Sequence, residues 1–362
     1  MDARPLVIDP DITRASTLPG SFYTDTDRFE RSRERVFARS WQWALDAREL
    51  DGPGAHRPLA LLPGVLDEPL VFTRDEAGVL ACLSNVCTHR ANAIVAAPGR
   101  SRALVCRYHG RRFDLAGRVQ SMPCFEGVQG FPAPSDDLAR VPHAELGPLA
   151  FVSAAPEHAF ERLIAPVRER VGWLPLDAFT PAPERSRAYE FDAHWALYCD
   201  NYLEGFHIPF LHGGLNAVIE FESYTTELFE LATLQIARSK PDEPAFDLPA
   251  SSPEHGERIG AYYFWLWPNL MLNFYPWGLS LNHVQPLGVA RTRVVFQSWI
   301  WKPELCDRGA GSGLHTVELE DEEAVVAVQR GVRSRFYSAG RYSPAQEAGV
   351  HHFHRLLAER LA

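Results

Sequence analysis

The chain has 362 residues, of which 46% are apolar and 23% are charged, and its net charge is −10 at pH 7. This length is enough for about two domains with a sizeable core, and the composition is typical of a globular protein. The acidic balance argues against a nucleic-acid binder, because such a protein needs a basic surface to replace the counterions of the phosphates.

The N-terminal part predicts a helical segment followed by a small β-domain. Residues 1–10 lack the basic stretch leading into an apolar one that a signal peptide has. No run of about 18 apolar residues occurs either, so we expect a cytoplasmic protein. Residues 24–40 have a helical pattern with Thr24 or Asp25 as N-cap. Over residues 41–155, short β-rich runs alternate with Gly, Pro and Asp turns, which is typical of antiparallel strands.

The C-terminal part predicts an antiparallel sheet packed on helices, and therefore an α+β fold. A candidate helix at residues 157–172 and a Pro-rich stretch at residues 174–186 precede it. A helical stretch starts near His194, and two further helices begin after His315 and after Pro344. Strand-like runs occupy residues 225–236, 260–267, 269–275 and 291–301. We assign residues 1–40 to the helical segment, 41–155 to the β-domain and 156–362 to the C-terminal domain.

Two loops of the β-domain each offer one thiolate and one imidazole. They read Cys87-x-His89 and Cys106-x-x-His109. Zinc accepts two thiolates and two imidazoles in one tetrahedron, whereas a [2Fe–2S] cluster takes the sulfurs on one iron and the imidazoles on the other. A zinc finger places a cysteine pair before a histidine pair, but here each loop carries one of each and lies between β-rich runs. The spacing therefore favours the cluster over zinc and over buried thiols without a metal.

A second constellation lies in the C-terminal domain, where Asn201 precedes Glu204-x-x-His207-x₄-His212. On a regular helix Glu204 and His207 lie about 60° apart, whereas His207 and His212 lie about 140° apart. Pro209 breaks the helical hydrogen-bond ladder between the two histidines and can bring His212 back round. Two imidazoles with one carboxylate form the facial triad of non-haem Fe(II) oxygenases.

The carboxylate of such a triad has to come from elsewhere in the chain. An acidic run supplies the candidates Glu318, Glu320, Asp321, Glu322 and Glu323. The alternative interpretation of this run is an acidic first turn that complements a helix dipole. Glu-x-x-His is also half of a di-iron bundle motif, but no second copy occurs in the sequence.

With both constellations, the chain from about Trp41 to its end resembles the catalytic alpha subunits of Rieske non-haem iron oxygenases. The resemblance implies an all-β Rieske domain joined to a helix-grip catalytic domain of the START type with an antiparallel sheet. The implied ligands of the [2Fe–2S] cluster are Cys87, His89, Cys106 and His109. Those of the mononuclear Fe(II) are His207, His212 and Asp321. We add Glu204 and Asn201 as catalytic candidates.

The family also implies partners. In it, the acid at the position of Glu204 bridges an iron-site histidine to a cluster histidine of the neighbouring subunit, a task that suits a carboxylate. The resemblance therefore implies a homotrimer. No flavin or nicotinamide motif is present, so a separate NAD(P)H-dependent reductase or ferredoxin has to supply electrons. Seven arginines and one acid lie within residues 90–118, and we expect them to dock an acidic donor or to pair across the trimer interface. Arg111 among them departs from the family, which usually has an aromatic residue there.

Residues 199–212 and 334–357 look most like the quaternary-ammonium branch of the family, which includes choline monooxygenases. This implies monooxygenation of an N-alkyl group. A ring-hydroxylating dioxygenase that yields cis-diols is the first alternative. A non-catalytic electron-transfer or ligand-binding protein is the second. Residues 261–278 contain eight aromatic residues, about half of which should face one side of the sheet. They can hold a quaternary ammonium by cation–π contacts or an aromatic ring.

Overall fold

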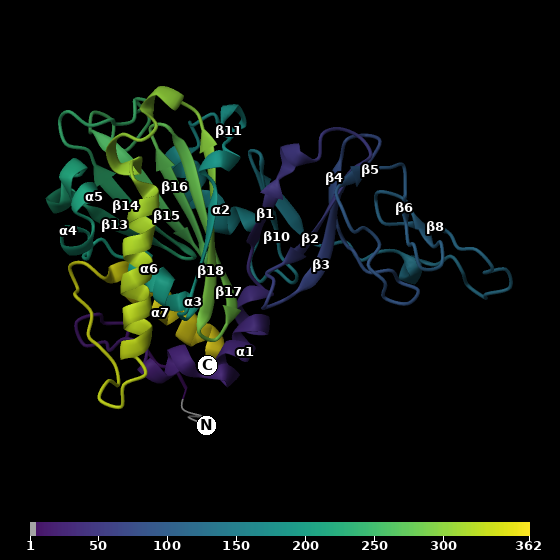
Figure 1. Cartoon of the computed structure of the whole chain (residues 1–362), viewed down its shortest axis with the longest axis horizontal. Helices are drawn as coiled ribbons and strands as arrows, with labels where there is room; N and C mark the ends of the chain where they lie inside the picture. The colour runs from purple at the N-terminus through teal and green to yellow at the C-terminus, as the bar shows by residue number, and fades with distance from the viewer. Residues whose placement is uncertain (1–4) are drawn as a thin grey trace. The chain divides into compact units, whose positions relative to one another are not determined.

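The computed structural model describes residues 5–362, and the chain separates into two compact units (Figure 1). The larger unit combines Met1–Phe37 with His158–Ala362, and the smaller unit is Ala38–Glu157. The first four residues, which belong to the stretch inspected for a signal peptide, lie outside the described part. Among the described residues, no helix combines the length and apolar character needed to cross a bilayer.

The smaller unit consists of three antiparallel sheets, as the alternation of β-rich runs and turns predicts. The sheet orders are β1-β10-β9, β4-β3-β2-β5 and β6-β7-β8. Phe72, Phe113 and Phe151 are fully buried in this unit. The strands are β1 Gln42–Asp46, β2 Ala55–Leu61, β3 Glu68–Arg74, β4 Leu80–Ser84, β5 Gly99–Arg100, β6 Leu104–Val105, β7 Arg112–Phe113, β8 Val119–Ser121, β9 His143–Leu146 and β10 Leu149–Val152.

The larger unit is built on an antiparallel sheet of order β11-β18-β17-β16-β15-β14-β13, with β12 also pairing with β18. The predicted run at 225–236 forms two strands joined by a tight turn, and three strands were not predicted: β11, β12 and β17. The strands are β11 Thr180–Pro181, β12 Arg187–Phe191, β13 Thr225–Phe229, β14 Ala232–Arg238, β15 Ile259–Leu266, β16 Leu270–Tyr275, β17 Gly278–Gly288 and β18 Arg291–Ile300.

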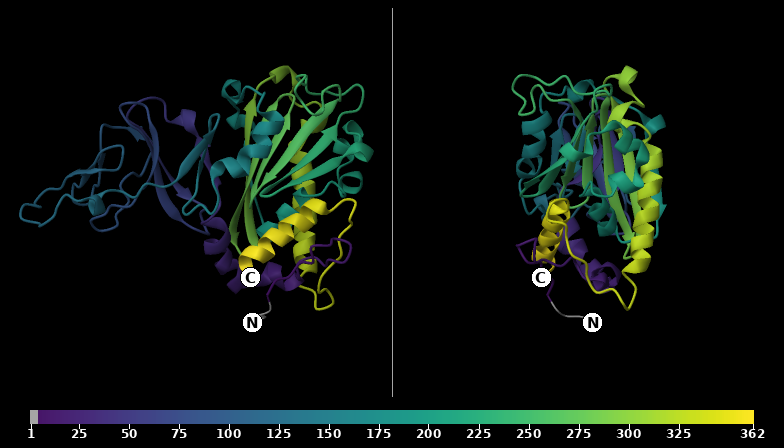
Figure 2. Two further views of the ribbon diagram at one scale, coloured as in Figure 1. Left: turned by 180° about the vertical axis from the view of Figure 1, so that it is seen from behind. Right: turned by 90° about the vertical axis from the view of Figure 1, so that its left-hand side faces the viewer.

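Helices pack on this sheet, so the predicted α+β class is confirmed. Helix α6 runs along the sheet in Figure 1, and Figure 2 shows it beside the strands when the view is turned by 90°. Asp25 caps α1 by accepting the amides of Asp27 and Arg28. The remainder of the predicted N-terminal helix is a π-helical turn over Arg33–Phe37. The α-helices are α1 Thr26–Ser32, α2 Phe160–Val171, α3 Trp195–Tyr202, α4 Ile208–Leu211, α5 Gly213–Val218, α6 Leu314–Gly331 and α7 Ala348–Leu361.

Candidate metal centres and active-site pocket

The two Cys/His loops of the smaller unit close in the same way. In each, the cysteine carbonyl accepts a hydrogen bond from the amide four residues on at 2.9 Å, and the cysteine amide donates to the carbonyl five residues on. The fourth residue has a positive φ in both loops, 55° at Ala91 and 75° at Gly110. This left-handed conformation favours glycine, and it lets each loop present its cysteine and histidine from one tight turn.

Between these two loops, the two cysteines lie next to each other and so do the two histidines. The thiols of Cys87 and Cys106 are buried and hydrogen-bonded to each other, and Asn92 Nδ2 donates to the Sγ of Cys106 at 3.6 Å. The rings of His89 and His109 meet edge to face with centroids 4.7 Å apart. Paired sulfurs and paired imidazoles fit a [2Fe–2S] cluster that has thiolates on one iron and imidazoles on the other.

Arg111, which follows the second loop, is buried and cannot belong to an exposed docking surface. Its side chain is only 2% exposed, and its guanidinium donates to Thr88 Oγ1 and to Asp136 Oδ1, both at 2.8 Å. The same group lies over the rings of Phe125 and Phe131. The expectation that Arg111 helps to dock an electron donor is therefore wrong. The residue instead ties the first ligand loop to a third segment of the unit.

The histidine motif of the larger unit does not form one kinked helix. Helix α3 ends at Tyr202, and the next helix, α4, begins only after His207. Pro209 lies in the first turn of α4, where a missing N–H has no cost, so it starts a helix rather than bending one. His212 is the residue at which α4 ends and α5 begins. The two imidazoles come together through this break, with ring centroids 4.9 Å apart.

Asp321 of α6 completes a three-residue group with the two histidines. Its Oδ1 lies 3.0 Å from His212 Nε2 and 3.6 Å from His207 Nε2, and Asn201 Nδ2 donates to the same oxygen at 2.6 Å. Among the residues that the structure describes, these three alone bring His, Cys, Asp or Glu ligand atoms close enough to hold one ion, all within 4.8 Å. The four cluster candidates form no such group, which disfavours a zinc tetrahedron there.

Two further carboxylates hold the outer sides of the histidine rings. Glu204 Oε1 lies 2.6 Å from Nδ1 of His207, and Glu320 Oε2 lies 2.7 Å from Nδ1 of His212. Both Nε2 atoms therefore face Asp321, as ligation of one ion through Nε2 requires. The sequence marks Glu320 only as one of five possible ligands, because its contact with His212 joins residues 108 positions apart.

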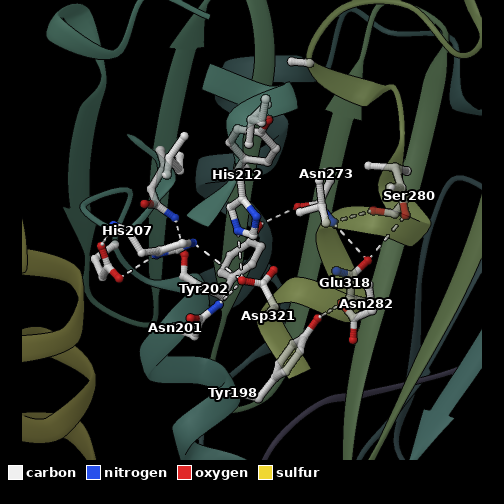
Figure 3. Close-up of a pocket in the computed structure, with 18 of the residues that line it drawn as sticks. Tyr198, Asn201, Tyr202, His207, His212, Asn273, Ser280, Asn282, Glu318 and Asp321 are labelled. Atoms are coloured by element: carbon white, nitrogen blue, oxygen red, sulfur yellow. Dashed lines mark hydrogen bonds and ion pairs between the residues drawn. The ribbon is translucent and has the colours of Figure 1, made fainter. Parts of the chain in front are cut away.

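The three-residue group lies in the wall of a cavity between α3, α6 and the sheet (Figure 3). Five tyrosines line it, and burial raises the pKa of Tyr202, Tyr224 and Tyr275 well above the usual range. These tyrosines stay neutral and present aromatic faces. Of the eight aromatic residues in 261–278, Tyr263 and Tyr275 line the cavity. The lining tyrosines are Tyr198, Tyr202, Tyr224, Tyr263 and Tyr275.

The polar lining of this pocket is made of carboxylates, amides and a hydroxyl. Besides His207 and His212, the polar residues are Asn201, Glu204, Gln235, Asn273, Ser280, Asn282, Glu318 and Asp321. Neither lysine nor arginine occurs among the lining residues that the structure describes. Such a lining suits a cation or a hydrogen-bond donor better than an anion. Among these amides, the sequence indicated Asn201. The other amides and the hydroxyl were not predicted, because they come from three separate strands and form no local motif: Gln235, Asn273, Asn282 and Ser280.

Comparison with known proteins gives matches to both parts of the chain. Residues 180–362 match the model of the ring hydroxylating alpha subunit (catalytic domain), and residues 40–132 match that of the Rieske [2Fe–2S] domain. The chain is 32% identical to a chloroplastic choline monooxygenase of Arabidopsis thaliana, with 98% of this chain and 85% of the relative covered. It is 28% identical to the carnitine monooxygenase oxygenase subunit of Escherichia coli K12, with 95% and 94% covered.

Solved structures share the fold. A quaternary ammonium Rieske monooxygenase superposes with a TM-score of 0.79 at 22% identity, covering 98% of this chain and 100% of that one. A naphthalene 1,2-dioxygenase from Rhodococcus sp. superposes with a TM-score of 0.74 at 17% identity, covering 95% and 93%. The predicted combination of a Rieske domain with a mixed helix and antiparallel-sheet domain is confirmed.

Proposed function

The chain belongs to the ring-hydroxylating oxygenase alpha subunits that carry a Rieske [2Fe–2S] domain, and we propose that it hydroxylates an N-alkyl carbon of a quaternary ammonium compound. It is an oxidoreductase, and its cofactors are a Rieske-type cluster and mononuclear Fe(II). The observation that carries the proposed substrate is the pocket beside His207, His212 and Asp321. That pocket combines tyrosine faces with carboxylates, and the described residues that line it include neither lysine nor arginine.

We assign the ligands from the side-chain pairings of the two sites. Cys87 and Cys106 hold one iron of the cluster, and His89 and His109 hold the other. His207, His212 and Asp321 hold the mononuclear iron. When bound, these groups supply electron storage and O₂ activation.

The surrounding residues position the ligands. Glu204 and Glu320 accept the Nδ1 protons of His207 and His212, which fixes the tautomer in which each Nε2 is free for the metal. Asn201 donates to Asp321 Oδ1 at 2.6 Å, so it orients the third ligand from within the pocket.

The substrate binds by its positive charge and by shape. Aromatic faces attract a quaternary ammonium by cation–π contacts, and the rings of Tyr263 and Tyr275 lie with centroids 5.9 Å apart on the pocket wall. Choline and carnitine, after which the similar monooxygenases are named, are both quaternary ammonium compounds. An aromatic hydrocarbon gains less from the carboxylates, so a ring dioxygenase fits this lining less well.

Electrons come from a separate reductase, which we expect to be an NAD(P)H-dependent protein or a ferredoxin. Six exposed arginines within residues 90–118 remain candidates for its docking surface or for subunit contacts: Arg90, Arg100, Arg102, Arg107, Arg112 and Arg118. We further propose a homotrimer in which Glu204 bridges His207 to a cluster histidine of the neighbouring subunit. We place the protein in the cytoplasm, because all six cysteines are unpaired and thiolate ligands persist in a reducing compartment.

Product analysis with labelled O₂ tests the function. The holoenzyme, supplied with a reductase, should convert a quaternary amine with one labelled oxygen atom in the hydroxylated carbon. The same preparation should contain two irons for the cluster and about one more for the triad. Conversion of an aromatic substrate to a diol with two labelled atoms, without turnover of any ammonium compound, would contradict the proposal.

A further inference from the structure

One carboxyl group of the pocket has no part in holding the metal. Glu318 of α6 is 2% exposed and lines the cavity. Its Oε2 accepts the hydroxyl of Tyr198 at 2.6 Å, a pair visible in Figure 3. Its Oε1 is buried and has no hydrogen-bond partner. A buried polar atom without a partner is costly, so this oxygen indicates a group that a ligand satisfies.

A second buried oxygen of the pocket lining also has no hydrogen-bond partner. Gln235 donates through Nε2 to the carbonyl of Tyr202 at 2.7 Å, but its Oε1 is buried without a partner. Gln235 Oε1 is an acceptor, and Glu318 Oε1 is one when the carboxyl is ionised, the form that a bound cation favours. They therefore need a positive charge, an O–H donor or the polarised C–H groups of N-methyl carbons, and they repel a carboxylate.

The two arginines of a neighbouring pocket are engaged elsewhere. A neighbouring pocket shares Ser280 and Leu314 with the cavity and contains Arg185 and Arg187. Arg185 forms a two-point ion pair with Asp307. Arg187 donates through Nη1 to two backbone carbonyls. A carboxylate at the far end of a substrate thus finds acidic and neutral groups in the cavity. Beyond it, Arg185 is already paired with Asp307, and Nη1 of Arg187 is occupied by backbone carbonyls.

We propose that Glu318 recognises the positive charge of the substrate and that the pocket selects ammonium compounds with a neutral, hydroxyl-bearing remainder over those with a carboxylate. This inference rests on the proposed function and narrows its substrate class. The carboxyl of Glu318 faces the cation, while the tyrosine faces surround its methyl groups. Gln235 Oε1 is the acceptor for the hydroxyl.

The test compares a cation with its neutral isostere. Choline and 3,3-dimethyl-1-butanol have nearly the same shape and differ in charge. Calorimetric titration of the holoenzyme should show at least about tenfold tighter binding of choline. Glu318→Gln should bring the two affinities within about threefold of each other. Glu318→Asp, which keeps the charge, should retain most of the preference and guards against a fold defect in the first variant.

The matched control is Glu323→Gln, since Glu323 lies on the same helix and is exposed to solvent. It should bind choline as the unmodified protein does. Iron content and thermal unfolding of each variant are measured alongside. An undiminished preference for choline in Glu318→Gln overturns the inference, as does equal binding of choline and its isostere by the unmodified protein.

A second titration tests whether the pocket prefers ammonium compounds without a carboxylate. Carnitine and γ-butyrobetaine should bind to the unmodified protein at least about tenfold more weakly than choline, and equal affinity would overturn this part of the inference. Failure of the inference is distinct from failure of the proposed function. If the protein oxidises an ammonium compound with labelled O₂ but Glu318→Gln binds choline normally, the proposed function stands and the inference fails. If no ammonium compound is oxidised but choline is still preferred over its isostere, the proposed function alone fails.

Discussion

Glu204 and His207 are joined at two points. Glu204 Oε2 accepts the backbone amide of His207 at 3.1 Å, and Oε1 lies 2.6 Å from the ring Nδ1. One carboxylate thus fixes both the start of α4 and the orientation of the imidazole. Because Nδ1 is held in this way, Nε2 is the nitrogen that faces Asp321.

Replacement of Glu204 by glutamine should uncouple electron delivery from the iron site. The glutamine amide accepts the Nδ1 proton of His207 more weakly than a carboxylate does, and it lacks the negative charge that strengthens this hydrogen bond. We expect product formation to fall at least about tenfold, while the iron content and the reduction of the cluster by dithionite stay normal. Glu323→Gln is the control. Normal turnover in Glu204→Gln would show that this carboxylate is not needed for electron transfer to the iron.

Replacement of His207 by alanine should remove the mononuclear iron and leave the cluster in place. The variant loses one of the three proposed ligands of the mononuclear iron, whereas the cluster candidates all lie in the smaller unit. Iron analysis should show a loss of about one iron per chain with unchanged visible absorbance. His255→Ala, at an exposed histidine, should keep all of the iron. Loss of the cluster absorbance in His207→Ala would show that the two sites are assigned wrongly.

Arg111 should matter for the integrity of the smaller unit. Arg111→Leu leaves Thr88 and Asp136 without their shared donor and removes the cation from the rings of Phe125 and Phe131. Removal of the buried guanidinium is destabilising, because it leaves the Asp136 carboxylate, which is 24% exposed, without its ion-pair partner. We expect the unfolding temperature to fall by about 5 °C or more and the cluster absorbance to decay faster in air. Arg112→Leu changes an exposed neighbour and should have little effect. Equally fast decay of the cluster absorbance in both variants would argue against a stabilising role of the contacts of Arg111.

The metal motifs could be predicted because each is local in sequence. Two loops with one cysteine and one histidine each, and two histidines five residues apart, predict ligands without knowledge of the fold. The choice of Asp321 from five acids came from the family resemblance. The geometry that separates it from Glu320 depends on which side of α6 faces the two rings, and sequence spacing does not give that.

The backbone conformation of the histidine motif could not be predicted from the sequence. Helical spacing favours one continuous helix through Glu204 and His212, but the helix is interrupted near Gly205. A side chain there would meet the ring of Tyr224, since a Cβ would lie 2.8 Å from it. That contact joins residues far apart in sequence, as does the pairing of Arg111 with Asp136.

Of the strands that were not predicted, β17 was missed for a related reason. Strand β17 carries Ser280, Asn282 and His283, which are polar, and Pro286 near its end. Such a composition does not predict a buried strand. Ser280 and Asn282 line the pocket, so the hydrophobic pattern fails where the sheet forms the site.

The affinity for choline should depend on pH through Glu318. Burial raises the pKa of this carboxyl well above its usual range; the hydrogen bond from Tyr198 opposes the rise, and the charges of Asp321 and Glu322 add to it. Without substrate, protonation of this carboxyl is therefore shifted toward neutral pH. A bound cation favours the ionised form, so binding lowers this pKa and releases a proton.

The sign of the pH dependence follows from that release. Affinity should increase as the pH rises, by up to about tenfold per pH unit, and should level off once the pH exceeds the pKa of the unliganded protein. Titrations between about pH 6 and 9, in buffers with different ionisation enthalpies, measure both the affinity and the released proton. Glu318→Gln should show neither effect. A pH dependence that persists in Glu318→Gln would assign the proton to another group of the pocket.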